Sequence, residues 1–120
     1  MRESEERFRL FFENANDAIF VMDVRTGRLL DANKEAERLT GRSHEELMGI
    51  YPAELFPPAE ASHYEERFRL HTQKGEATSF EGEVLAGDGR SVPVYISTNL
   101  LKSEDGEVIL AIFRDISGYK

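Results

Sequence analysis

A predicted β-hairpin from Ser91 to Ser117 constrains the fold of this chain more than any other stretch. Its first half alternates between apolar and polar residues, which indicates a strand with one buried face, formed by Val92, Val94, Ile96 and Thr98. Gly106 ends the following turn, where a glycine can take the positive φ that a tight hairpin often needs. The second half, from Val108 to Phe113, is apolar on both faces, which is typical of a strand inside a covered sheet. The hairpin therefore predicts a sheet with one cupped face and a second apolar face that needs its own cover.

Three more strands are predicted before this hairpin. Short apolar runs at 17–23 and 29–32 flank a turn and indicate a second hairpin, whose first strand is again apolar on both faces. The segment 78–86 carries Phe80 and Val84 on one side and glutamates on the other, as exposed edge strands often do. Five strands and several helices together predict an α+β domain.

Helix signals lie between these strands. Asn33 is placed to accept a hydrogen bond from the first turn of the helix that follows it, and Gly41 suits the left-handed position at its end. Ser43 and Glu46 have the spacing of a capping box and predict a second short helix. The longest helix is predicted at 60–74.

Residues 1–14 form a charged amphipathic helix in which Phe8, Phe11 and Phe12 share one stripe. Burying each of these rings would contribute roughly 1.5–3 kcal/mol, so something is expected to cover them. Two interpretations stay open: the helix packs on its own domain alone, or it covers the sheet and also pairs with a second copy of the chain.

Composition excludes several classes of protein. The chain has 120 residues, enough for one domain, and its 15 basic against 23 acidic residues give a net charge of −8, the wrong sign for a nucleic-acid binder. It has no cysteine, so disulfides and thiolate metal sites are excluded. No apolar run approaches the roughly 18 residues of a membrane span, and the amino terminus is not signal-like. We expect a soluble module in the cytoplasm that does not contact the membrane.

Several short segments carry a family resemblance, and they occur in the family's order and spacing: 14–19 (NANDAI), 31–36 (DANKEA), 39–41 (LTG), 43–49 (SHEELMG), 87–90 (GDGR) and 114–117 (RDIS). With them the chain resembles a PAS domain over essentially its whole length. The resemblance implies a five-stranded antiparallel sheet in the order 2-1-5-4-3, with short helices over its concave face. It also divides the chain into a capping or dimerisation helix at 1–14, the PAS domain at 15–117 and the start of an output linker at 118–120.

The resemblance also implies a function. PAS domains sense small molecules, light, gas or redox state, or dimerise, and they pass the change to a kinase, cyclase or chemoreceptor output module. We therefore expect a sensory module of a larger signal-transduction protein, such as the sensor histidine kinase of a two-component system, with its output domain fused outside this chain. It would bind a small apolar ligand or relay a conformational change. The alternative is a purely structural dimerisation module with a filled core. An enzyme is not expected, because the histidines lie on different helices or turns and the inward strand positions offer no acid or base.

The resemblance also limits which cofactors this chain is expected to bind. Light-sensing flavin members use a cysteine, which is absent here, and that subclass is excluded. Haem-binding members carry a histidine on the long helix, but that position falls on Ala61, and His63, two residues away, would point elsewhere. His71 is the other candidate ligand on this helix, but a lone histidine on a helix is usually a surface or partly packed residue. Haem is therefore disfavoured, while a non-covalently bound flavin stays open. His44 superficially resembles a phosphoacceptor histidine, but Gly49 and Pro52 stop its helix after about one turn.

Alternation along the strands predicts two sets of site residues. The first set should face the helices and line a core or a small cavity: Phe20, Met22, Phe80, Val84, Val94, Ile96, Ile109, Ala111 and Phe113. The second set should carry the dimer contact and the signal: Phe8, Phe11 and Phe12 on the first helix, with Leu110, Ile112 and Asp115 on the fifth strand. Ile19, Val21 and Val108 extend this outward apolar patch, over which we expect the first helix of the same chain or of a partner.

Overall fold

A computed structural model describes residues 2–74 and 78–119 of the chain. The elements in order are α1 (Arg2–Asn14), β1 (Ala18–Asp23), β2 (Leu29–Ala32), α2 (Lys34–Thr40), α3 (His44–Leu47), the short 3₁₀ helices η1 (Pro52–Leu55) and η2 (Pro58–Glu60), α4 (Ala61–Lys74), β3 (Thr78–Leu85), β4 (Ser91–Ser103), β5 (Gly106–Asp115) and a last 3₁₀ turn, η3 (Ser117–Tyr119). The described helices include none that is long and apolar enough to cross a membrane.

The five strands form one antiparallel sheet in the order β2-β1-β5-β4-β3, which confirms the predicted topology. The two strands that the sequence predicted to be apolar on both faces, β1 and β5, pair with each other in the interior of the sheet. The long β4–β5 hairpin places Ile96 directly opposite Phe113, and Gly106 closes its turn with a φ of 132°. Strand β3 lies at the edge, and its Glu81 and Glu83 are exposed as predicted.

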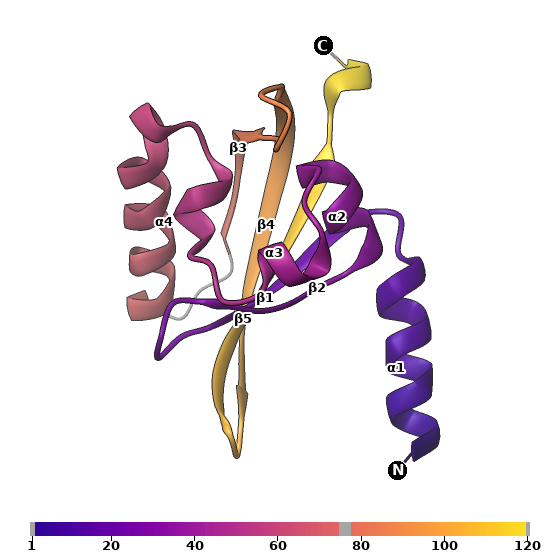
Figure 1. Cartoon of the computed structure of the whole chain (residues 1–120). Coiled ribbons are helices and arrows are strands. Elements are labelled where there is room, and N and C mark those ends of the chain that lie inside the picture. Colours follow the sequence, from indigo (N-terminus) through magenta and orange to yellow (C-terminus); the bar gives the residue numbers. More distant parts are fainter. Residues whose placement is uncertain (1, 75–77, 120) are drawn as a thin grey trace.

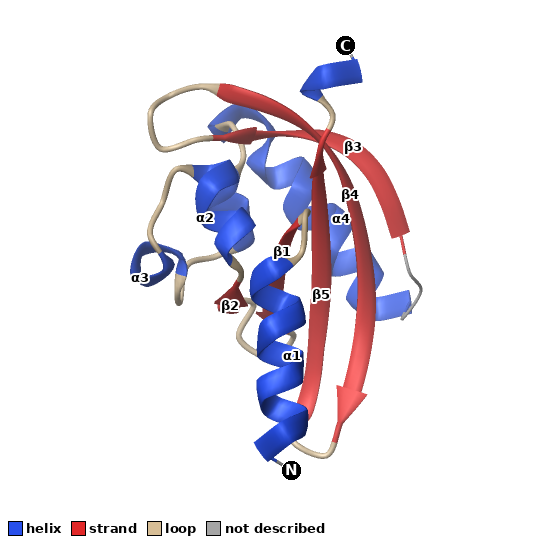
Figure 2. Cartoon of the chain, turned by 90° about the vertical axis from the view of Figure 1, so that its right-hand side faces the viewer, coloured by secondary structure: helices blue, strands red, loops and turns tan. Residues whose placement is uncertain are grey.

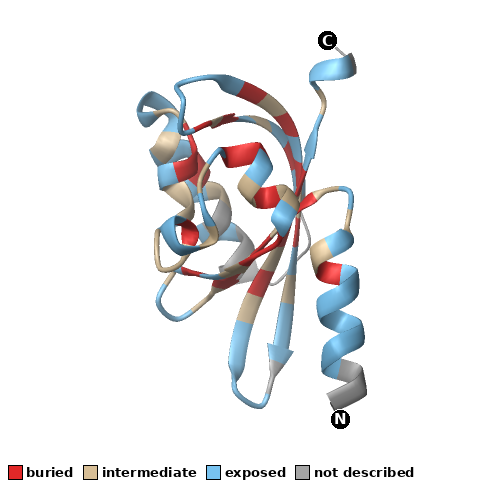
Figure 3. Cartoon of the chain, turned by 45° about the vertical axis from the view of Figure 1, so that its right-hand side comes forward, coloured by how far each residue is buried: buried red, intermediate tan, exposed pale blue. Residues whose placement is uncertain are grey.

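The sheet separates two unequal layers. Helices α2, α3 and α4 lie on its inner side with the short 3₁₀ helices, whereas α1 lies on the opposite, outer side (Figure 1). Viewed from that outer side, α1 passes in front of the sheet without packing along it, and among the other elements it mainly contacts α2 (Figure 2). Buried residues concentrate between the sheet and the inner helices, while α1 is exposed along most of its length (Figure 3). The core therefore belongs to the inner layer.

The short inner helices begin where local capping predicts. The Asn33 side chain accepts a hydrogen bond from Ala36 N at 3.0 Å, and Gly41 ends α2 in the left-handed region with a φ of 65°. The Ser43 side chain accepts from Glu46 N, and the Glu46 carboxylate accepts from Ser43 N, which completes the capping box of α3. The bond that the Glu46 carboxylate accepts from Ser43 N, with a further contribution from the Ser43 hydroxyl, also lowers the pKa of Glu46. Helices this short depend on such caps, because they are too brief to be stable alone.

Candidate functional site

The inner face of the sheet and the helices above it form one hydrophobic cluster. The residues predicted to face the helices are all buried within it: Phe20, Met22, Phe80, Val84, Val94, Ile96, Ile109, Ala111 and Phe113. From the helical side the cluster also takes Leu47, Leu55, Phe56 and Tyr64. For Leu47, Leu55 and Phe56 the sequence did not predict which side faces inward, because segments of about one turn are too short for a helical period to define a face. Whether this inner surface lines a ligand site stays a prediction.

Aromatic rings fill the middle of this cluster. The Phe113 ring on β5 lies 4.8 Å from that of Phe20 and 6.0 Å from that of Phe56, measured between centroids. Phe56 in turn stacks on Tyr64 of α4 at 3.8 Å, and Tyr64 lies 6.0 Å from Phe80 on β3. The rings therefore make a continuous contact from α4 across the core to the central strand.

The enclosed space that the described core residues leave between them is very small. A cavity of about 10 Å³ remains among apolar side chains of Phe20, Met22, Leu29, Pro52, Leu55, Ile109, Ala111 and Phe113. A single water needs roughly 10–15 Å³ and several polar partners, while ligand pockets usually measure about 300–1,000 Å³. The cavity is therefore far smaller than a haem or a flavin. His63 lies exposed on α4, with its ring edge toward Tyr64, and the side chain of His71 lies outside the described residues.

Tyr64 fastens α4 to the edge of the sheet. Its hydroxyl oxygen accepts a hydrogen bond from Glu83 N at 3.1 Å, and its burial raises the pKa of the phenol, so the ring stays neutral. Gly82 allows this approach, because a Cβ at that position would lie 2.7 Å from the hydroxyl oxygen. The polar end of Tyr64 is therefore satisfied while its ring fills the core.

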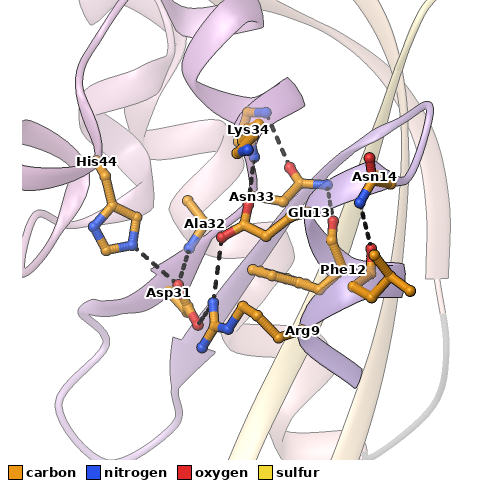
Figure 4. A network of polar contacts seen from close by, with 11 residues as sticks. Arg9, Phe12, Glu13, Asn14, Asp31, Ala32, Asn33, Lys34 and His44 are labelled. Atoms are coloured by element: carbon orange, nitrogen blue, oxygen red, sulfur yellow. Dashed lines mark hydrogen bonds and ion pairs between the residues drawn. The ribbon is translucent and has the colours of Figure 1, made fainter. Parts of the chain in front are cut away.

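A buried amide joins α1 to the rest of the domain (Figure 4). Asn33 has no exposed surface, and its Nδ2 donates to the carbonyl oxygens of Phe12 at 2.9 Å and Asp17 at 3.0 Å. Its Oδ1 accepts from Ile19 N at 2.9 Å as well as from Ala36 N. The sequence predicted only the last of these four bonds, because the other partners come close only after the chain has folded. One side chain thus holds the end of α1, the entry to β1 and the start of α2.

A partly exposed group of polar side chains lies beside this amide (Figure 4). Arg9 of α1 pairs with Asp31 of β2, with 3.4 Å between Nη1 and Oδ2, and His44 Nε2 lies 3.1 Å from the other oxygen of Asp31. Glu13 accepts a hydrogen bond from Lys34 N at 3.0 Å. These contacts bring together four elements, α1, β2, α2 and α3, and the sequence did not predict them, although Asp31 and His44 lie in two of the segments that carry the family resemblance.

The residues predicted to carry the dimer contact lie on the outer side of the sheet. Of the α1 phenylalanines only Phe12 is buried, at 3% exposure, whereas Phe8 and Phe11 are 56% and 65% exposed. The patch residues are half-buried: Ile19, Val21, Val108, Leu110 and Ile112. Asp115 is exposed at the end of β5, and its carboxylate accepts from the backbone and hydroxyl of Ser117. The dimer itself stays a prediction.

Comparison with known proteins identifies the family of this chain and two curated relatives. A family model described as the PAS fold matches residues 6–116. The methyl sulfide methyltransferase-associated sensor of Methanosarcina acetivorans is 28% identical over all of this chain, and the sensor histidine kinase TmoS of Ectopseudomonas mendocina is 30% identical over 98% of it. The chain spans only 12% of the length of each of these two relatives.

Solved structures show the same architecture. The PAS domain of an HTR-like protein from Haloarcula marismortui superposes with a TM-score of 0.77 at 26% identity, covering 96% of this chain and 93% of that one. The family match extends from within α1 to the residue after β5, and the sheet order agrees with the order that the family resemblance implied. This chain belongs to the PAS fold family.

Proposed function

We propose that this PAS domain is a sensory or regulatory module of a larger signal-transduction protein, with a histidine kinase of a two-component system as its first candidate output and a cyclase or chemoreceptor as the others. Both curated relatives are sensors by name, and the matched region is a small part of each. In this proposal residues 1–14 form the dimerising helix, 15–117 the sensory domain and 118–120 the start of the output linker. The module itself carries no catalytic role.

The observation that carries the proposal is the filled core and its contact with β5. Tyr64 of α4 packs on Phe56, which lies between η1 and η2, and Phe56 packs on Phe113. On β5 the buried residues alternate with Val108, Leu110 and Ile112, which belong to the outer patch. The strand ends at Asp115. Because packed cores transmit displacement rather than absorbing it, a shift of the inner helices would move the outer patch and the end of β5 together. We therefore favour relay of a conformational change over tight binding of a large cofactor.

A UV–visible absorption spectrum and mass spectrometry of the purified protein test whether the domain holds a cofactor or ligand. Protein purified under native conditions is expected to show no Soret or flavin absorption band and to release no stoichiometric small molecule on denaturation, because the core leaves about 10 Å³. A retained apolar molecule at one per chain would instead support the ligand-binding form of the sensor. It would also require the aromatic side chains of the core to repack around it.

The second part of the proposal is a homodimer formed through the outer side of the sheet and α1. Phe8 and Phe11 are too exposed to be explained by packing within one chain, and the half-buried patch lies on the same side of the sheet. Apolar surface of this kind commonly marks a protein interface. A purely structural dimerisation module would share this interface but would not need the core to respond to anything.

Sedimentation velocity tests the interface. The parent chain is expected to sediment as a dimer, while Phe11→Glu and Leu110→Glu should shift it toward the monomer, because each places a charge in the apolar contact. Leu10→Glu is the matched control, since Leu10 is equally exposed but about 100° or more around α1 from Phe8 and Phe11. A parent chain that is monomeric at high concentration, or a dimer that none of these changes weakens, would refute this interface.

A further inference from the structure

Helix α1 is attached to the domain at two places of different character. Its carboxyl-terminal end is anchored by Phe12, whose ring is buried and whose carbonyl oxygen accepts from the buried amide of Asn33. The Glu13 carboxylate adds a bond from Lys34 N in the same region. These contacts form the anchor, and they hold the last turn of α1 firmly because breaking them would leave a buried amide unpaired.

The second attachment lies about one turn earlier and is partly exposed. It consists of Arg9, Asp31 and His44, and we call it the clasp (Figure 4). The side chains of Arg9 and Asp31 are 53% and 24% exposed, and the Arg9–Asp31 contact measures 3.4 Å. Arg9 Nη1 also lies 3.4 Å from Glu13 Oε2 on its own helix, so it has a second carboxylate to pair with if it leaves Asp31.

This difference makes the clasp the weaker point. An exposed ion pair changes an equilibrium by only about two- to fivefold, because water and salt screen it and two long side chains lose freedom to form it. Arg9 loses little on release, since Glu13 remains within reach on α1 itself. Phe8 and Leu10, next to Arg9, are exposed and add little packing against the domain. The amino-terminal part of α1 can therefore lift while the anchor stays closed.

We propose that α1 is a strap that pivots at its anchor and is held down by the Arg9–Asp31–His44 clasp. His44 is the first residue of α3, so the clasp connects the strap to the helices that cover the core. A displacement of α3 would move His44 away from Asp31 and weaken the hold on Arg9. Opening would change the angle at which Phe8 and Phe11 are presented to a partner chain. This consequence for the partner, though not the strap itself, rests on the proposed dimeric relay.

The absence of cysteine allows a direct distance measurement. Spin labels are placed at Glu5→Cys on α1 and Glu45→Cys on α3, both exposed positions. Pulsed electron paramagnetic resonance then measures the distance between α1 and α3. Dilution with unlabelled chain removes distances between protomers. Asp31→Asn and Arg9→Gln are each expected to raise the ratio of long to short distances about two- to fivefold. Combining them should add nothing, because both remove the same contact.

Two controls distinguish the effect of losing the clasp from the effect of removing any surface charge and from unfolding. Glu35→Gln breaks an exposed pair with Arg38 that lies wholly within α2, and it should leave the distances unchanged. Asp31 also accepts a bond from Ala32 N, so if Asp31→Asn does not fold by circular dichroism, Arg9→Gln on the exposed face of α1 decides the matter. Unchanged distances in folded Arg9→Gln would overturn the clasp. Longer distances with an unchanged sedimentation coefficient would keep the clasp and refute only its role in the proposed dimer.

Discussion

Replacing Asn33 by alanine is expected to lower the free energy of unfolding by roughly 3–5 kcal/mol, several times the cost of losing a helix cap alone. The cap on α2 accounts for about 1 kcal/mol of this. The remainder arises because the carbonyls of Phe12 and Asp17 and the amide of Ile19 lose a bonding partner that is completely buried. A buried polar group left without a partner costs about 1–3 kcal/mol. The total approaches the whole stability of a small domain, which is about 5–15 kcal/mol.

Urea unfolding followed by circular dichroism measures this decrease in the free energy of unfolding. Two further variants show whether it comes from the helix cap or from the other bonds of Asn33. Ser43→Ala removes an exposed cap whose side chain bonds only within the capping box with Glu46, and it should cost only about 1 kcal/mol. Asn33→Asp keeps both accepted bonds but turns the two donations into repulsion between oxygens, so it should release the end of α1 while the cap of α2 persists. Equal losses for Asn33→Ala and Ser43→Ala would mean that Asn33 acts as a cap and nothing more.

The other large effect is expected at the centre of the sheet. Phe113→Ala should cost about 3–5 kcal/mol and Ile96→Ala about 2–5 kcal/mol, since each leaves a cavity in a packed core. Phe113 packs against the rings of Phe20 and Phe56, and Ile96 lies directly opposite it on β4. The double variant should be non-additive by about 0.5–3 kcal/mol because the two residues are neighbours.

Tyr95 provides the matched comparison for these core changes. It precedes Ile96 on the same strand but points to the outer side, where it is exposed. Tyr95→Ala should therefore change the free energy of unfolding by less than about 1 kcal/mol in the same denaturant experiment. Near-neutral results for both Ile96→Ala and Phe113→Ala would contradict the assignment of the inner face.

Much of the fold could be predicted because its signals are local. Alternation in β4 identified Val92, Val94, Ile96 and Thr98 as inward, and all four are buried. Apolar residues on both faces of β1 and β5 predicted strands in the interior of the sheet, because only an interior strand has cover on both sides. The caps at Asn33 and Ser43 were readable because a cap and its partner are three residues apart.

The candidate site was predicted only in part, because much of it depends on contacts between distant segments. Three of the four bonds of Asn33, and the contact of Asp31 with both Arg9 and His44, join residues that lie far apart along the chain. The core cavity is closed partly by Pro52 and Leu55 of η1, and this element of four residues has no period long enough to define a face. Alternation thus determined which strand residues point inward. Only the tertiary structure decided that aromatic rings fill the space between them, and that α1 is held at one end by a buried amide and along its side by a partly exposed clasp.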